Sequence, residues 1–124
     1  NAVLAAQVAG AAKIVAVDML DSKLALARQL GATHAVNAGA ADAAEQIREA
    51  TKGGVDYAFE MAGSVRAMDL AYRVTRRGGT TVTCSLPNPG HRLQLPVVQM
   101  TAEERTLKGS YLGSSVPARD WRRA

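Results

Sequence analysis

The sequence predicts an α/β fold in which a parallel sheet carries helices on both of its faces. Segments with helical periodicity alternate with short apolar segments along the whole chain, which is typical of parallel sheets. One apolar segment, residues 14–17, has no polar break, as expected of a strand that is buried on both faces. It ends at Asp18, and open α/β sheets bind their ligands at the carboxyl ends of their strands.

Around this strand the sequence predicts two helices and a second strand. Apolar residues at helical spacing predict a helix over residues 1–9, which Gly10 ends. A second helix is predicted over residues 22–30, and Gly31 ends it. A short edge strand is expected over residues 32–37. Together these elements form the second half of a βαβ unit.

The first half of that unit, a strand and a glycine-rich turn, is not in the sequence. In the doubly wound order 3-2-1-4-5-6 the first strand lies at the centre of the sheet. Its absence leaves the strands at residues 14–17 and 55–59 without a neighbour, and each unpaired buried backbone group costs about 1–3 kcal/mol. We therefore expect that further residues precede Asn1 or that a partner chain supplies the strand.

The middle of the chain continues the alternation. A helix over residues 42–51 is expected to begin with a capping box, in which Asp42 is followed three residues later by Glu45. A strand is predicted over residues 55–60. The next helix is predicted over residues 65–74, directly after a Gly-Ser pair.

The last third of the chain is less regular. Two arginines and two glycines at residues 76–79 are expected to end the preceding helix. Three prolines and a glycine forbid a regular element through most of residues 86–96. The elements predicted in this third are a strand over residues 80–85, a short helix near 97–100, a strand over 106–112 and a helix that begins at Ser115.

Composition narrows the classes of protein to consider. With 124 residues the chain is one domain at most, and its hydrophobic content of 48% is too high for a disordered chain. The net charge of +4 is mild, and the basic residues cluster at Arg76-Arg77 and near the C-terminus. They are interpreted as solvated helix ends, because a nucleic-acid site would need interleaved aromatic residues or a known module.

The cysteine content and the hydropathy of the sequence indicate the cellular compartment in which the protein is expected. The chain has one cysteine, Cys84, so it can form no internal disulfide and no zinc site built from cysteines. A reducing cytoplasm is therefore the expected location. No apolar segment approaches the ~18 residues that a membrane-spanning helix needs, so no membrane association is expected.

Several segments carry a family resemblance, and they occur in order and with matching spacing. They are residues 9–18, Lys23, residues 30–33, Val36-Asn37, residues 53–63 and residues 108–110. Together they resemble the coenzyme domain of zinc-type (medium-chain) alcohol dehydrogenases. The resemblance covers nearly the whole chain and is closest to the members that use NAD.

The resemblance implies that residues 1–124 are part of a Rossmann-like dinucleotide-binding domain that lacks its first strand. The full enzyme would transfer a hydride between an alcohol and NAD, with zinc polarising the alcohol oxygen. In that family the zinc ligands and the substrate cleft come mainly from a separate, earlier domain, which is not in this sequence. The chain alone is therefore expected to be inactive and to bind NAD weakly at best.

Asp18 is the principal candidate for coenzyme binding. A carboxylate at the end of the second strand of a complete fold can accept hydrogen bonds from both hydroxyls of the adenosine ribose. Its charge would repel a 2′-phosphate and so favour NAD over NADP, and the next residues, Met19 and Leu20, provide no arginine for that phosphate. The alternative is that Asp18 only caps the turn that follows. The resemblance also places Lys23 near the ribose, whereas the simpler alternative is an exposed lysine in the first helical turn.

Two further groups of residues follow the later strands. The resemblance places Met61, Ala62 and Gly63 along the adenosine and ribose side of the coenzyme, although Met61 could equally belong to the core. It further implies that backbone groups meet the nicotinamide carboxamide. The residues that supply those groups are Cys84, Ser110 and Leu112.

Three other functions remain open. The chain could belong to a quinone reductase or a polyol dehydrogenase of the same superfamily. An S-adenosylmethionine-dependent methyltransferase also holds a ribose with an acid after the second strand, but it needs an antiparallel strand near its C-terminus. The third is a non-catalytic oligomerisation module. In the resembled family the proline-rich loop at residues 86–96 and the last strand join subunits edge to edge, so a homo-oligomer is expected.

Overall fold

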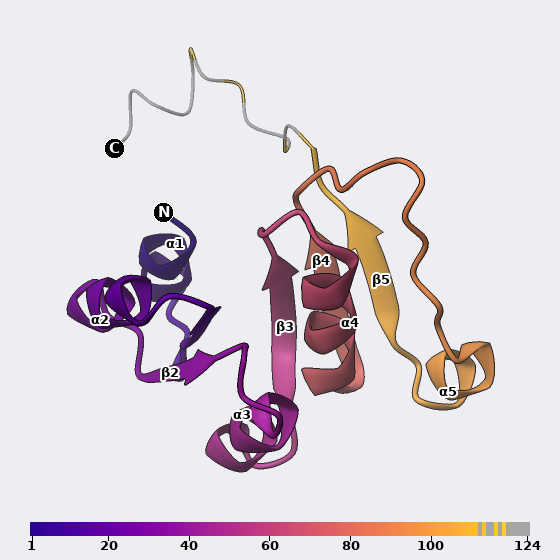
Figure 1. The fold of residues 1–124 in the computed structure, drawn as a ribbon, viewed down its shortest axis with the longest axis horizontal. Helices are drawn as coiled ribbons and strands as arrows, with labels where there is room; N and C mark the ends of the chain where they lie inside the picture. Colours follow the sequence, from indigo (N-terminus) through magenta and orange to yellow (C-terminus); the bar gives the residue numbers. More distant parts are fainter. Residues whose placement is uncertain (112, 114–115, 117, 119–124) are drawn as a thin grey trace. The chain divides into compact units, whose positions relative to one another are not determined.

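The computed structural model of the chain describes residues 1–111, 113, 116 and 118. It divides into two compact units, Asn1–Val55 and Asp56–Ala124. Helices and strands alternate in both units, and the strand pairs with a defined register are parallel (Figure 1). The predicted α/β fold is therefore confirmed.

In the first unit a two-stranded parallel sheet is flanked by helices. Strands β1 and β2 pair in register from Val15 opposite His34 to Asp18 opposite Asn37. Helix α2 contacts both strands, and α3 contacts β2. The elements of this unit are α1 (Ala2–Val8), β1 (Val15–Asp18), α2 (Asp21–Gln29), β2 (His34–Asn37) and α3 (Ala43–Thr51).

The start of α3 differs from the prediction. Asp42 is the N-cap residue, but its side chain bonds to no backbone N–H group of the helix. Its Oδ1 atom instead accepts a hydrogen bond of 2.8 Å from Nε2 of Gln46. A capping side chain needs an extended N-cap backbone, whereas Asp42 has φ −102° and ψ 20°. The predicted capping box with Glu45 is therefore wrong, although the position of the helix is right.

In the second unit three strands lie in the order β3-β4-β5, and helix α4 packs on β4 (Figure 1). Strands β4 and β5 are parallel, in register from Thr80 opposite Thr106 to Thr83 opposite Gly109. The elements are β3 (Val55–Glu60), α4 (Val65–Val74), β4 (Thr75–Thr83), α5 (Val97–Ala102) and β5 (Thr106–Gly109).

Strand β4 begins five residues before the predicted start and ends two residues before the predicted end. The polypeptide passes from α4 into the strand without a loop, so residues 76–79 belong to the strand and do not form a helix stop. Arg76 bonds to the Asp56 carboxylate at 2.6 Å, and a Cβ atom on Gly79 would lie 3.0 Å from the Asp56 carbonyl oxygen. Glycine is therefore needed where β4 passes close to the start of β3.

Strand β5 is shorter than predicted, since it ends at Gly109 and not at residue 112. The helix predicted to begin at Ser115 lies outside the described residues. Within the part of the chain that the structure describes, β1 and β3 are each the end strand of their own sheet.

The core of the second unit contains an unsatisfied hydroxyl group. Tyr72 is 2% exposed, and its Oη atom has no hydrogen-bond partner among the described residues. The Arg105 guanidinium lies over the ring, 4.9 Å from its centroid, and phenylalanine would keep that contact. Because an unpaired buried hydroxyl is destabilising, Tyr72→Phe is expected to raise the free energy of unfolding by about 1 kcal/mol. Urea denaturation checks this, and a loss of stability would contradict it.

Candidate functional site

One candidate site lies in the first unit, at the carboxyl end of β1. Oδ1 of Asp18 accepts a 3.0 Å hydrogen bond from the backbone N–H of Leu20, and Oδ2 lies 3.9 Å from Nζ of Lys23. The Asp18 side chain is 34% exposed. One oxygen thus caps the following turn, as the simpler interpretation expects, while the other faces Lys23 and can be reached by a ligand.

Asn37 holds the turn that follows Asp18. Its Nδ2 atom donates to Oδ1 of Asp21 at 2.9 Å and to the carbonyl oxygen of Met19 at 3.3 Å. Its Oδ1 atom accepts a 2.8 Å hydrogen bond from the backbone N–H of Gly39. The sequence analysis did not identify Asn37 as a site residue. The signal that could have found it is its place at the end of β2, opposite Asp18 in the parallel register.

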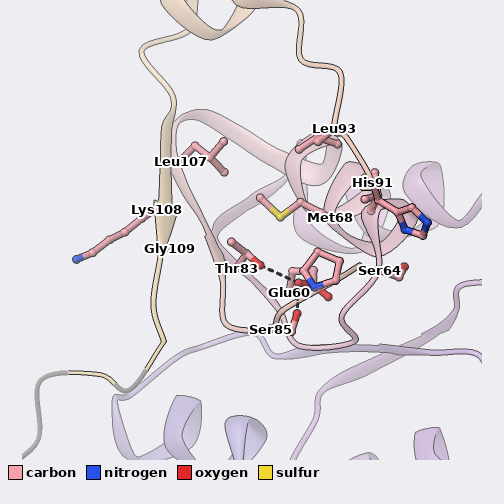
Figure 2. Close-up of a pocket in the computed structure, with 12 residues that line it drawn as sticks. Glu60, Ser64, Met68, Thr83, Ser85, His91, Leu93, Leu107, Lys108 and Gly109 are labelled. Carbon is pink, nitrogen blue, oxygen red and sulfur yellow. Dashed lines mark hydrogen bonds between the residues drawn. The ribbon is translucent and has the colours of Figure 1, made fainter. Parts of the chain in front are cut away.

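A second candidate site, in the other unit, is built around Glu60 at the carboxyl end of β3. This side chain is 3% exposed and accepts four hydrogen bonds. Oε1 accepts from the backbone N–H groups of Ala62 and Gly63, both at 2.7 Å. Oε2 accepts from the hydroxyls of Thr83 at 2.9 Å and Ser85 at 2.5 Å (Figure 2).

These hydrogen bonds control the charge of Glu60. Burial by itself raises the pKa of this carboxyl, but the bonds from Ser85, Thr83, Gly63 and Ala62 together lower the pKa below its ordinary value. Glu60 is therefore ionised at neutral pH. The stabilisation that follows is fully present above the ordinary pKa of a glutamate and is lost as the pH falls through the lowered pKa.

Backbone hydrogen bonds join the carboxyl ends of the three strands in this unit. The backbone N–H of Cys84 donates to the Glu60 carbonyl at 2.9 Å, and that of Ser110 donates to the Thr83 carbonyl at 2.9 Å. Cys84 and Ser110 line a pocket of about 280 Å³. A neighbouring pocket of about 290 Å³ is lined by Glu60, Ser64, Met68, Thr83, Ser85 and Leu107, among others (Figure 2).

The structure describes all but one of the predicted site residues. Met61 is 57% exposed, so the alternative that it belongs to the core is wrong. Gly63 has φ +72°, a backbone conformation that favours glycine, and its N–H also lies 2.9 Å from Oγ of Ser85. The predicted residue Leu112 lies outside the described residues. The sequence analysis missed Glu60 and Ser85 as site residues.

The donor groups of the described residues fit a dinucleotide but not a zinc ion. In the first unit the Asp18 carboxylate and the nearby Lys23 suit the hydroxyls of a ribose, and in the second unit backbone groups at strand ends suit an amide. Among residues 1–111, 113, 116 and 118, no three His, Cys, Asp or Glu side chains are grouped so that they could bind a metal. The described part of the chain also contains no helix that is both long enough and apolar enough to cross a membrane.

Comparisons with known proteins identify the family. The whole chain, residues 1–124, matches the family described as zinc-binding dehydrogenase. It is 40% identical to the NDMA-dependent alcohol dehydrogenase of Amycolatopsis methanolica over 124 residues, which are 97% of this chain and 33% of that protein.

Solved structures agree with this match. Benzyl alcohol dehydrogenase of Acinetobacter calcoaceticus superposes with a TM-score of 0.92 at 35% identity, covering 98% of this chain and 34% of that one. A Sinorhizobium meliloti 1021 protein, described as a zinc-binding dehydrogenase bound to NADP, superposes with a TM-score of 0.85 at 28% identity. The superposition covers 90% of this chain and 33% of that one. The chain spans about a third of the length of these relatives. Because the family match covers every residue, the chain belongs to the zinc-binding dehydrogenase family and corresponds to its Rossmann-like coenzyme-binding region.

Proposed function

We propose that this chain forms the coenzyme-binding part of an NAD-dependent, zinc-type alcohol dehydrogenase. The complete protein would transfer a hydride between an alcohol and NAD, and zinc bound outside the described residues would polarise the alcohol oxygen. Family membership and the alcohol dehydrogenases among the relatives support this proposal. The observation that carries it is the Asp18 carboxylate at the carboxyl end of a parallel strand, with one oxygen facing Lys23.

The preference for NAD is proposed from the same carboxylate. An oxygen that accepts hydrogen bonds from ribose hydroxyls would repel the 2′-phosphate of NADP. Lys23 is 63% exposed and would lie beside the ribose, where its charge orients the carboxylate. One relative is bound to NADP, so the family alone does not decide between the two coenzymes.

The remaining contacts are proposed for the ends of the later strands. Met61, Ala62 and Gly63 would lie along the adenosine and ribose side of the coenzyme. The N–H groups of Cys84 and Ser110 are already bonded within the sheet, so their carbonyl oxygens are the groups that would accept from the nicotinamide carboxamide. A backbone group of Leu112 completes this proposed set.

The proposal is tested by calorimetric titration of the natural protein with NAD and with NADP, together with a hydride-transfer assay on a panel of alcohols. We expect tighter binding of NAD, by about tenfold or more, and reduction of NAD by at least one alcohol. Tighter binding of NADP would favour the quinone reductase alternative. If neither dinucleotide binds and neither changes the thermal stability, the oligomerisation module is the better assignment.

We also propose a homo-oligomer in the cytoplasm. All four residues of β5 are exposed, and β5 is an end strand of its sheet, so its outer edge can pair with another strand. The cytoplasmic location follows from the single cysteine, Cys84, which leaves the chain without an internal disulfide.

A further inference from the structure

We propose that Glu60 is a positioning residue, which joins the carboxyl ends of β3 and β4 so that residues 61–63 and 84–85 hold the coenzyme in one fixed geometry. This inference rests on the proposed function, because residues 61–63 and Cys84 are assigned to the coenzyme there. Glu60 itself is buried and is not assigned a contact with the coenzyme.

The number of donors that meet at this side chain requires a carboxylate. Two backbone N–H groups and two hydroxyls point at Glu60. Since Oγ of Ser85 also accepts from the N–H of Gly63, the hydroxyl hydrogen of Ser85 is directed to Glu60. An ionised carboxylate has about four acceptor sites and no donor, whereas a glutamine amide has one acceptor oxygen and two N–H donors. Only the carboxylate can therefore accept all four hydrogen bonds.

Strand pairing alone does not explain why a charge is buried here. The two strands are already joined at this end by the bond from the Cys84 N–H to the Glu60 carbonyl. A buried charge is costly unless hydrogen bonds compensate it, and apolar residues would pair two strands without that cost. The bonds that compensate Glu60 come from neutral groups, and three of the four donors lie beyond the ends of the two strands.

What Glu60 adds is therefore order in segments outside the sheet. Residues 61–63 follow the last residue of β3, and Met61 projects into solvent. Two of the three N–H groups in this segment, those of Ala62 and Gly63, bond to the one carboxylate oxygen. Its other oxygen binds Ser85, next to Cys84. A single side chain thus sets the spacing between the proposed adenosine-side and nicotinamide-side contacts, and an ordered site binds a coenzyme more tightly than a mobile one.

The test is Glu60→Gln in the natural protein, which keeps the size of the side chain and removes two acceptor sites. We expect the Kd and the KM for NAD to rise by about tenfold, because segments that are no longer held in one geometry must be ordered when NAD binds. The KM for the alcohol and kcat should change much less. Ser85→Ala, which removes one donor and leaves the charge, should raise the Kd for NAD by a smaller factor. Glu60→Asp keeps the charge and should restore part of the affinity.

Thr75→Val is the matched control for a purely structural effect. Thr75 is a buried residue at the other end of β4, and its hydroxyl bonds to the Ala71 carbonyl and pairs with Thr81, both at 2.8 Å. This variant should lower the melting temperature and leave the Kd for NAD unchanged.

An unchanged Kd for NAD in Glu60→Gln, with a lowered melting temperature as in Thr75→Val, would overturn the inference and make Glu60 structural only. If Glu60→Gln does not fold, Ser85→Ala decides, and an unchanged Kd in that variant overturns the inference. Absence of dinucleotide binding by the unsubstituted protein is a different result. It overturns the proposed function, and this inference falls with it.

Discussion

Asp18→Asn is expected to weaken NAD binding by about 10- to 100-fold. Asparagine keeps the size of the side chain but loses the charge and one acceptor oxygen, and a hydrogen bond to a charged group contributes about 1.5–3 kcal/mol. NADP binding should fall less or improve, because the repulsion of the 2′-phosphate is removed. The ratio of the Kd for NADP to the Kd for NAD should therefore fall toward one or below it. Calorimetry on the natural protein measures both constants.

Asp42→Asn controls for the change in net charge. Asp42 lies in the same unit, is exposed and bonds through its side chain to Gln46, far along the chain from the proposed ribose site. This variant should bind both dinucleotides as the unsubstituted protein does. Equal affinities for NAD in Asp18→Asn and Asp42→Asn would show that Asp18 only caps the turn to Leu20 and would remove the basis of the coenzyme assignment.

Ile47→Ala is expected to lower the free energy of unfolding by about 2–5 kcal/mol, the usual range for truncating a fully buried isoleucine. Ile47 is 1% exposed, and it lies on α3, which contacts β2. The loss is large beside the 5–15 kcal/mol that stabilises a typical domain. Urea denaturation, followed by circular dichroism at constant pH and salt, measures it.

Glu49→Ala provides the comparison for this change. Glu49 is exposed on the same helix, and alanine has the higher helix propensity, so the free energy of unfolding should change by less than about 0.5 kcal/mol. A similarly small change in Ile47→Ala would show that α3 does not pack on the sheet as described. The two variants therefore separate the loss of core packing from any effect on the helix itself.

Local sequence was sufficient to predict the bounds of elements whose apolar residues recur with a strong periodicity and whose ends are marked by a clear boundary residue. Helix α4 has the predicted bounds, and Oγ of Ser64 accepts a 3.0 Å hydrogen bond from the N–H of Ala67, as expected of a residue that begins a helix. Strand β3 also has the predicted bounds. Strand β4 was misplaced because the Arg-Arg-Gly-Gly segment is typical of a helix end. In the structure this segment instead extends beside β3, where Arg76 pairs with Asp56 and Gly79 permits the close approach.

By itself the sequence determined the α/β class, the parallel order of the elements and Asp18 as the candidate ligand of a ribose, because periodicity and the residue at a strand end are local properties. Only the tertiary structure showed the roles of Glu60 and Asn37. Their partners lie up to 25 residues away in the sequence, on a neighbouring strand, in the turn after a strand or at the start of α2. A polar side chain at a strand end has the same local pattern whether it meets solvent or four donors, and only the packing of the strands brings those donors within hydrogen-bond distance.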